Sequence, residues 1–249
     1  MKLTILGCYA PYAPKEGACN SYLIQSDNLN IMVDCGHGAF AQLQRYINFR
    51  DVHTLVITHF HPDHYADIHA VRHAFSGALR DGSRTDPLIV YAPSEPALIF
   101  EEINNWRDVF ITIPIEDAIH RENKFGLVRL NFFPTSHPMP TFGVKIIKDD
   151  KVFTYTSDTA LNNNLVDECM GSKIILAEAS LRDTDIAYTN KGHMTAKQAG
   201  LLAQKVYAEK LILTHFWPEY NLHQLKREAE VSFDGNVNLA EMGKTFILD

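Results

Sequence analysis

Apolar and polar positions follow two periods along the chain, and each change of period marks a new element. Short runs rich in β-branched and aromatic residues predict strands at 2–8, 21–25, 30–34, 54–58, 88–92, 109–114, 127–134, 142–147, 152–156, 173–177, 211–214 and 245–248. Apolar residues at helical spacing predict helices at 40–47, 66–79, 96–105, 196–207 and 222–231. Polar turns join 21–25 to 30–34 and 142–147 to 152–156, which predicts two hairpins.

The order of these elements indicates the fold class. Each half of the chain runs through strands and then helices, which is typical of an α/β fold with layers in the order αββα. We therefore expect a four-layer sandwich of two mixed β-sheets flanked by helices. A length of 249 residues suits a single domain covering 1–249.

Composition excludes several classes of protein. The net charge is −7 and no basic stripe is visible, which argues against tight non-specific binding of nucleic acid. The sequence contains no run of about 18 apolar residues, so we expect no membrane span. The first residues turn polar too quickly for a signal peptide, and the four cysteines lack C-x-x-C spacing, so we expect free thiols and a cytoplasmic location.

The segment 57–67 concentrates the candidate chemistry. It places His59, His61, Asp63 and His64 within six positions, directly after a predicted buried strand. Imidazole nitrogens and carboxylate oxygens are ligands of zinc and related divalent metals. In an extended stretch His59 and His61 point to the same side, whereas Asp63 and His64 follow a Pro62 turn. This arrangement predicts two adjacent metals rather than one.

Three later residues complete a ligand inventory. His137, Asp158 and His215 each follow an apolar strand in a loop, where sites are usually built. Taken singly, each would be an ordinary residue. We expect one metal at His59, His61 and His137, and a second at Asp63, His64 and His215, with Asp158 bridging both. Zinc is the first expectation, with manganese or iron as alternatives. Two metals about 3.5–4 Å apart lower the pKa of a shared water.

In this order, the His-x-His-x-Asp-His motif followed by a lone His, an Asp and a final His resembles the metallo-β-lactamase fold over nearly the whole chain. The segments Ala177-Glu178-Ala179-Ser180, 192–199 and Leu213-Thr214-His215-Phe216 look like the tRNase Z-like phosphodiesterase branch. That resemblance implies proton transfer to the leaving group by Glu178 and His193. His193 has a structural alternative as a residue beside Thr195, a good N-cap. The residues expected to act in catalysis are Asp63, His193 and Glu178.

One departure from that branch narrows the expected function. tRNase Z carries an inserted arm between the lone His and the Asp, but here Asp158 comes only 21 positions after His137. This argues against tRNA as the substrate. The expected function is hydrolysis of a small or nucleotide-like phosphodiester by an arm-less relative, and the resemblance also implies a possible homodimer. The alternatives are hydrolysis of a lactone, carboxylic ester or thioester at the same metals, and a metal-binding or redox protein that is not a hydrolase.

The remaining candidates are given weaker roles. Asp34 is expected to orient the metal loops by hydrogen bonds. Asp67 is expected to do the same or to serve as an acid at a helix N-terminus. His69 and His73 share a helix face that we expect to be solvated. Four aromatic residues are candidates for the pocket mouth or for the core: Tyr65, Phe216, Trp217 and Tyr220.

Overall fold

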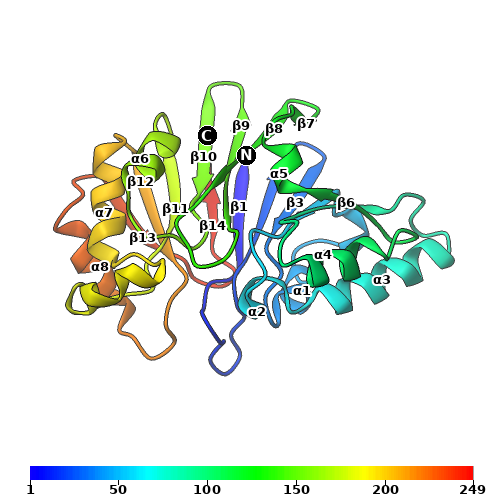
Figure 1. Ribbon diagram of the computed structural model, residues 1–249, viewed down its shortest axis with the longest axis horizontal. Coiled ribbons are helices and arrows are strands. Elements are labelled where there is room, and N and C mark those ends of the chain that lie inside the picture. Colours follow the sequence, from blue (N-terminus) through cyan, green and yellow to red (C-terminus); the bar gives the residue numbers. More distant parts are fainter. Residues whose placement is uncertain (249) are drawn as a thin grey trace.

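Two seven-stranded sheets form the centre of the computed structural model, which describes residues 1–248 (Figure 1). The predicted domain 1–249 also includes Asp249, which lies outside the described residues. The first sheet has the order β14 (Thr245–Ile247), β1 (Lys2–Gly7), β2 (Ser21–Ser26), β3 (Leu29–Val33), β4 (Thr54–Val56), β5 (Leu88–Ala92) and β6 (Phe110–Pro114). The second has the order β13 (Asn236–Leu239), β12 (Lys210–Thr214), β11 (Ile174–Glu178), β10 (Lys151–Tyr155), β9 (Phe142–Lys148), β8 (Val128–Pro134) and β7 (Asn123–Phe125).

Both sheets are mixed. Strands β3 to β6 are parallel, as are β10 to β13, and both predicted hairpins, β2–β3 and β9–β10, pair antiparallel. Helices flank the sheets: α3 and α4 lie on the right in Figure 1, and α7 and α8 on the left. The expected four-layer αββα class with two mixed sheets is therefore confirmed.

The helices have the following bounds: α1 Ala39–Leu43, α2 Pro62–Tyr65, α3 Ile68–Arg80, α4 Ala97–Asn104, α5 Ile115–Ala118, α6 Asn163–Cys169, α7 Ala196–Lys205 and α8 Leu222–Glu230, with 3-10 turns at Phe49–Asp51 and Asp183–Lys191. Among residues 1–248, none of these helices has the length and apolar character needed to cross a bilayer.

The cores explain the alternation of apolar positions. Along β2, Tyr22 and Ile24 face the second sheet, whereas Leu23 faces the helices. The rings of Tyr22 and Tyr155 meet between the sheets at 4.8 Å. On the outer side, α3 buries a stripe that includes Val71 and Phe75 against the first sheet. Because strands of the first sheet are buried on both faces, they read as nearly continuous apolar runs.

Some predicted boundaries were wrong. The helix expected at 66–79 is α3, which begins two residues later, at Ile68, and ends at Arg80. A separate short helix, α2, precedes it, because Pro62 at a first-turn position starts a helical turn with its fixed φ. The helix expected at 40–47 ends at Leu43, and the strand expected at 54–58 ends at Val56. Seven short elements were not predicted: the turn Phe49–Asp51, α2, α5, β7, α6, the turn Asp183–Lys191 and β13.

Candidate metal centre

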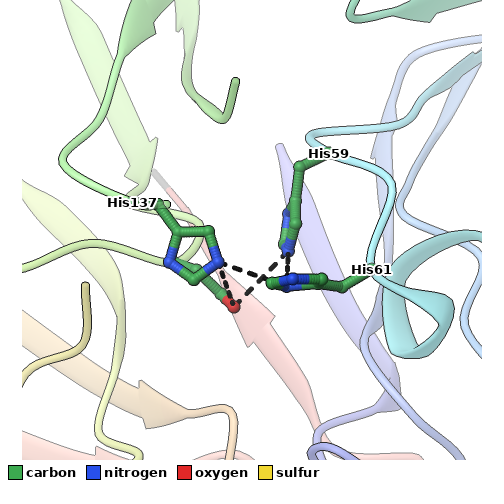
Figure 2. Close-up of side chains that lie close together, drawn as sticks. His59, His61 and His137 are labelled. Carbon is green, nitrogen blue, oxygen red and sulfur yellow. Dashed lines mark hydrogen bonds and ion pairs between the residues drawn. The ribbon is translucent and has the colours of Figure 1, made fainter. Parts of the chain in front are cut away.

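The first ligand set joins residues from both halves of the chain. His59 and His61 lie in the loop after β4, and His137 lies in the loop after β8. The Nδ1 atom of His61 lies 3.1 Å from His59 Nε2 and 3.2 Å from His137 Nε2. Figure 2 shows the three rings pointing toward one another. The side chains that the sequence assigned to one metal are therefore brought together.

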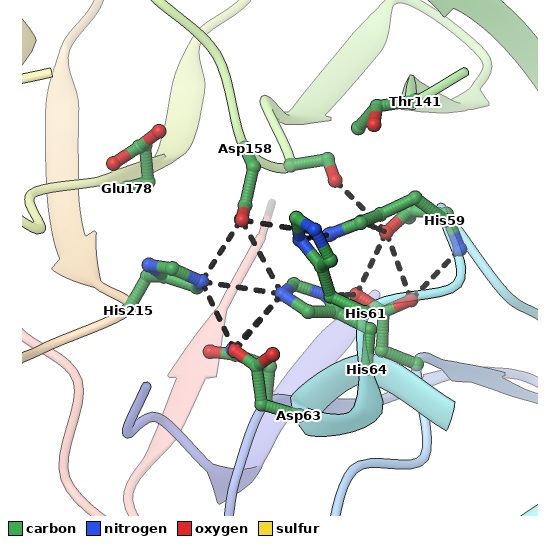
Figure 3. A network of polar contacts seen from close by, with 12 residues as sticks. His59, His61, Asp63, His64, Thr141, Asp158, Glu178 and His215 are labelled. Carbon is green, nitrogen blue, oxygen red and sulfur yellow. Dashed lines mark hydrogen bonds and ion pairs between the residues drawn. The ribbon is translucent and has the colours of Figure 1, made fainter. Parts of the chain in front are cut away.

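The second ligand set lies beside the first. Asp63 and His64 belong to α2, and His215 follows β12. The Nε2 atoms of His64 and His215 are 3.2 Å apart. Asp63 Oδ2 lies 3.5 Å from His64 Nε2 and 3.4 Å from His215 Nε2 (Figure 3). All three side chains are buried.

Asp158 stands between the two sets, in the loop after β10. Its Oδ2 faces the first set, at 3.5 Å from His59 Nε2 and 3.9 Å from His137 Nε2. Its Oδ1 faces the second set, at 3.3 Å from His64 Nε2 and 3.0 Å from His215 Nε2. One carboxylate thus offers one oxygen to each set, which is the arrangement that a bridging ligand requires.

Asp34 orients two of the histidines from behind. Its Oδ2 lies 2.8 Å from His64 Nδ1, and its Oδ1 accepts the backbone N–H of Thr58 at 2.8 Å. The Thr58 hydroxyl also donates to Asp34, so its oxygen is left to accept from His59 Nδ1 at 3.3 Å. Both histidines therefore carry a proton on Nδ1 and turn Nε2 toward the ligand sets.

Two more of the five histidines in the ligand sets, His137 and His215, are oriented in the same way. His137 Nδ1 donates to the carbonyl oxygen of Gly192 at 3.0 Å. His215 Nδ1 lies 2.6 Å from Ser180 Oγ, whose own hydroxyl donates to Glu178 Oε2 at 2.5 Å. Because the Ser180 proton is committed to Glu178, its oxygen accepts from His215. His215 then also presents Nε2 inward.

This donor set fits divalent metal ions. Two facing imidazole lone pairs repel each other, so each close nitrogen pair needs a proton or a cation between its members. Asp158 Oδ1 is buried and has no hydrogen-bond partner among the described residues, which is a costly state for a carboxylate oxygen. Neutral imidazoles and carboxylates together suit zinc, manganese or iron.

The two sets differ in protonation when no metal is bound. Burial lowers the pKa of His59 well below its ordinary value, and it also lowers those of His61 and His137. Burial likewise opposes a charge on His215, but Asp158 and Asp63 outweigh it and raise the pKa of His215 to about 10. The first set is therefore ready to coordinate at neutral pH, whereas the second must first lose a proton.

Glu178 and His193 form a pair beside the second set. Glu178 is completely buried at the end of β11, and its Oε1 lies 3.1 Å from His193 Nδ1. The backbone N–H of Thr159 donates to the same oxygen at 2.7 Å. Burial opposes a charge on His193, but the nearby Glu178 carboxylate raises its pKa above the ordinary value. Since Nδ1 is engaged by Glu178, Nε2 is left free to hold an exchangeable proton.

A cavity of about 700 Å³ opens over the site. Its floor includes His61, Asp63, Asp158, His193 and His215. Its walls are mainly apolar and aromatic: Pro11, Pro62, Leu181, Tyr188, Trp217 and Tyr220. The candidate metal ligands are therefore accessible to a small molecule from one side.

The beta-lactamase superfamily domain matches residues 29–216 of the chain, a span that contains every residue of both ligand sets. The chain belongs to this superfamily. It is 27% identical over 244 residues to the probable metallo-hydrolase YhfI of Bacillus subtilis, covering 98% of each protein. The YhfI crystal structure superposes with a TM-score of 0.93 over 98% of each chain, at 25% identity.

Two further comparisons extend the similarity to a ribonuclease Z in sequence and to a diphosphatase in fold. Ribonuclease Z of Thermobifida fusca is 24% identical over 302 aligned positions, which cover 96% of this chain and 92% of that protein. A diphosphatase of the PhnP family has a TM-score of 0.75 at 16% identity, covering 98% of this chain and 96% of that one. The expected resemblance to an arm-less tRNase Z-like member is confirmed, and the relatives identify the superfamily member as a metallo-hydrolase.

The structure gives each of the residues with weaker expected roles a definite position. Trp217 and Tyr220 line the cavity, whereas Phe216 is fully buried in the core and Tyr65 packs against Phe60. The Asp67 carboxylate accepts the backbone N–H of Phe40, which ties α1 to the metal loop. The two helix histidines, His69 and His73, are exposed as expected.

Sequence reasoning gave no role to two polar residues that touch the ligand sets. Ser180 lies in a segment that was noted only for its resemblance, although its position two residues after Glu178 puts both side chains on the same side of an extended stretch. Asn20 is fully buried, and its amide nitrogen lies 3.2 Å from His64 Nε2 and 3.4 Å from Asp63 Oδ2. Tyr22 holds that amide by donating to Asn20 Oδ1 at 3.1 Å. No sequence pattern marks Asn20.

Proposed function

We propose that this metallo-hydrolase is a dinuclear metal-dependent phosphodiesterase acting on a small or nucleotide-like phosphodiester. The observation that carries the proposal is the Glu178–His193 pair, which lies beside the second ligand set and whose histidine lines the cavity. A phosphodiester has a poor leaving group unless its oxygen is protonated, and His193 is positioned to supply that proton. The relatives include proteins named as a ribonuclease and as a diphosphatase, both of which cleave bonds to phosphorus.

The metals would be held by the residues described above. His59, His61 and His137 would bind one ion, Asp63, His64 and His215 the other, and Asp158 would bridge them. When bound, a metal pair supplies a water of lowered pKa and neutralises charge on the phosphoryl oxygens. Zinc is the first choice for this set, with manganese or iron as alternatives.

Residues of the chain itself orient the metal ligands and transfer the proton. Asp34, Ser180 and the Gly192 carbonyl fix the histidine tautomers, so no ligand has to reorient when substrate arrives. Glu178 stabilises the imidazolium form of His193 before transfer and orients the ring. After His193 Nε2 gives its proton to the leaving oxygen, the remaining Nδ1 proton still bonds to Glu178.

The segment between His137 and Asp158 supports a small substrate. Its strands are those of the hairpin β9–β10, in which 144–148 pair with 151–155. No arm projects from it to grip a large RNA. The main alternative remains hydrolysis of a lactone, carboxylic ester or thioester, which the apolar cavity walls would also accept.

Metal-free protein reconstituted with zinc, or separately with manganese, tests the proposal on bis(p-nitrophenyl) phosphate and on p-nitrophenyl acetate. We expect metal-dependent release of nitrophenolate from the phosphodiester, with a higher kcat/KM than from the acetate. The variant Asp158→Ala should lose both metal and turnover. Hydrolysis of the acetate alone, with two metals bound, would move the assignment to carbonyl chemistry.

A further inference from the structure

The cavity has an unusual charge balance for an enzyme that acts on an anion. None of its lining residues in the described range 1–248 is a lysine or an arginine. Apart from its histidines, the only ionisable groups that could carry charge near pH 7 are three carboxylates, Asp63, Asp158 and Asp185. Polyanionic nucleic acids are usually held by lysine and arginine contacts to phosphates away from the reacting centre. This cavity offers no such contact.

The nearest arginine is occupied within the protein. Arg182 makes a bidentate pair with Asp185, with Nε 2.8 Å from Oδ2 and Nη2 3.1 Å from Oδ1. Its guanidinium lies 4.6 Å above the centre of the Tyr220 ring, and the Tyr220 hydroxyl donates to Asp185 at 3.0 Å. Asp185 therefore neutralises Arg182 and leaves its guanidinium no free positive charge for a substrate anion.

The centre itself has little positive charge to spare. Four carboxylates, those of Asp34, Asp63, Asp158 and Glu178, are buried in or directly behind the ligand sets. Two divalent ions and the His193 imidazolium would together bring five positive charges, so one is left over, which matches the single charge of a phosphodiester. A phosphodiester can still coordinate through its oxygens, but a second anionic group finds no unbalanced cation nearby.

We propose that the cavity selects phosphodiesters with a single negative charge and an apolar or flat aromatic ester arm, and discriminates against substrates with a second anionic group on that arm. This inference rests on the proposed phosphodiesterase function and names its substrate class. Leu181, Tyr188, Trp217 and Tyr220 provide the surface for the arm, and aromatic rings favour stacking on a flat group. Asp185 is the specificity-determining residue, because its ion pair keeps Arg182 from binding the second charge.

A matched pair of substrates tests this selection. Phenyl p-nitrophenyl phosphate and 4-carboxyphenyl p-nitrophenyl phosphate have the same leaving group and differ by one carboxylate on the remaining arm. With zinc-loaded wild-type protein, we expect kcat/KM to be at least about tenfold lower for the carboxylated ester, mainly through KM. Equal kcat/KM for the two esters would overturn the selection while leaving the phosphodiesterase function standing. No metal-dependent turnover of either ester would overturn both.

Two variants locate the cause of the discrimination. Asp185→Asn keeps an oxygen for the Arg182 contacts but removes the carboxylate charge that neutralises the guanidinium, so the ratio of the two kcat/KM values should fall at least about fivefold. Tyr188→Lys, at a side chain that is 62% exposed, adds a cation at the cavity wall without disturbing the core and should lower the same ratio. An unchanged ratio in both variants would refute the electrostatic explanation.

Asp183→Asn is the matched control. It makes the same change two residues away, where Asp183 pairs with Lys197 outside the cavity lining at 3.2 Å. The control should keep the wild-type ratio. A shift in the control as large as that in Asp185→Asn would show a general charge effect rather than selection in the cavity.

Discussion

The hydrogen bonds of Asp34 allow one substitution to be followed atom by atom. In Asp34→Asn, one carboxylate oxygen becomes an NH2 group with no other change in size. The oxygen must stay on the Oδ1 side, because the backbone N–H of Thr58 donates there at 2.8 Å and a backbone donor has no acceptor form. The NH2 group then replaces Oδ2, which lies 2.8 Å from His64 Nδ1.

This exchange inverts the tautomer of His64. Facing an NH2 donor, Nδ1 must present its lone pair, so the proton moves to Nε2, the atom 3.2 Å from His215 Nε2. That proton occupies the position of the second metal. Changing the outer partner of a metal-bound histidine typically costs about 10–100-fold in affinity. At about 1.4 kcal/mol per tenfold, this equals roughly 1.4–2.8 kcal/mol.

Calorimetric titration of metal-free protein with zinc measures the effect. In Asp34→Asn, we expect zinc to bind about 10–100-fold more weakly at the second ligand set, while its affinity for the first set stays nearly unchanged. The titration should show this loss in the weaker of its two binding events. Asp67→Asn is the control, because that carboxylate holds the backbone of Phe40 and touches no ligand. Wild-type affinity for two zinc ions in Asp34→Asn would refute the tautomer argument.

Three further outcomes are expected. Zinc binding at pH 8 should release at least one proton per chain, because the pKa of His215 is raised to about 10 in the metal-free protein. For the same reason, the affinity for zinc should fall as the pH is lowered from 10. Calorimetry in two buffers of different ionisation enthalpy measures the proton release. Gly192→Ala should weaken zinc binding and thermal stability together, since Gly192 has φ +86° and a Cβ there would lie 2.8 Å from His137 Nδ1; a variant with unchanged zinc affinity would contradict this. His193→Gln should keep both metals but lose about 10²–10⁴-fold in kcat on a dialkyl phosphodiester, and much less on a nitrophenyl ester, as measured by metal analysis and product release.

The grouping of the candidate ligands could be predicted because much of their chemistry is local. His59, His61, Asp63 and His64 lie within one loop and one helical turn, so their spacing alone restricts where the side chains point. His137, Asp158 and His215 lie far apart in the sequence, but each follows a strand of the second sheet, and the ends of neighbouring strands meet at one edge. The alternation of apolar residues predicts those strands, and the strands bring the ligands together.

The supporting residues could not be predicted in this way. Asn20 contacts His64, 44 positions away, and Ser180 contacts His215, 35 positions away, so their neighbours in the sequence do not reveal these contacts. The same reason applies to β13, whose Asn-rich segment is a strand because it pairs with β12 and not because of its own propensity. Which nitrogen each histidine presents also depends on distant partners such as Asp34 and the Gly192 carbonyl.

The segment 178–193 both supports the candidate metal centre and lines the cavity. Its ends are fixed to the metal centre, through Ser180 at one end and the Gly192 carbonyl at the other, and a bridge between Leu181 and Thr195 closes its base. Its middle carries Asp185 and Tyr188 along the cavity wall. Substitutions in the middle can therefore change the substrate without moving a ligand, whereas substitutions at the ends act on the metals. Proteins that share these ligand sets can therefore differ in substrate. This is why the metal motif identifies the superfamily but not the reaction.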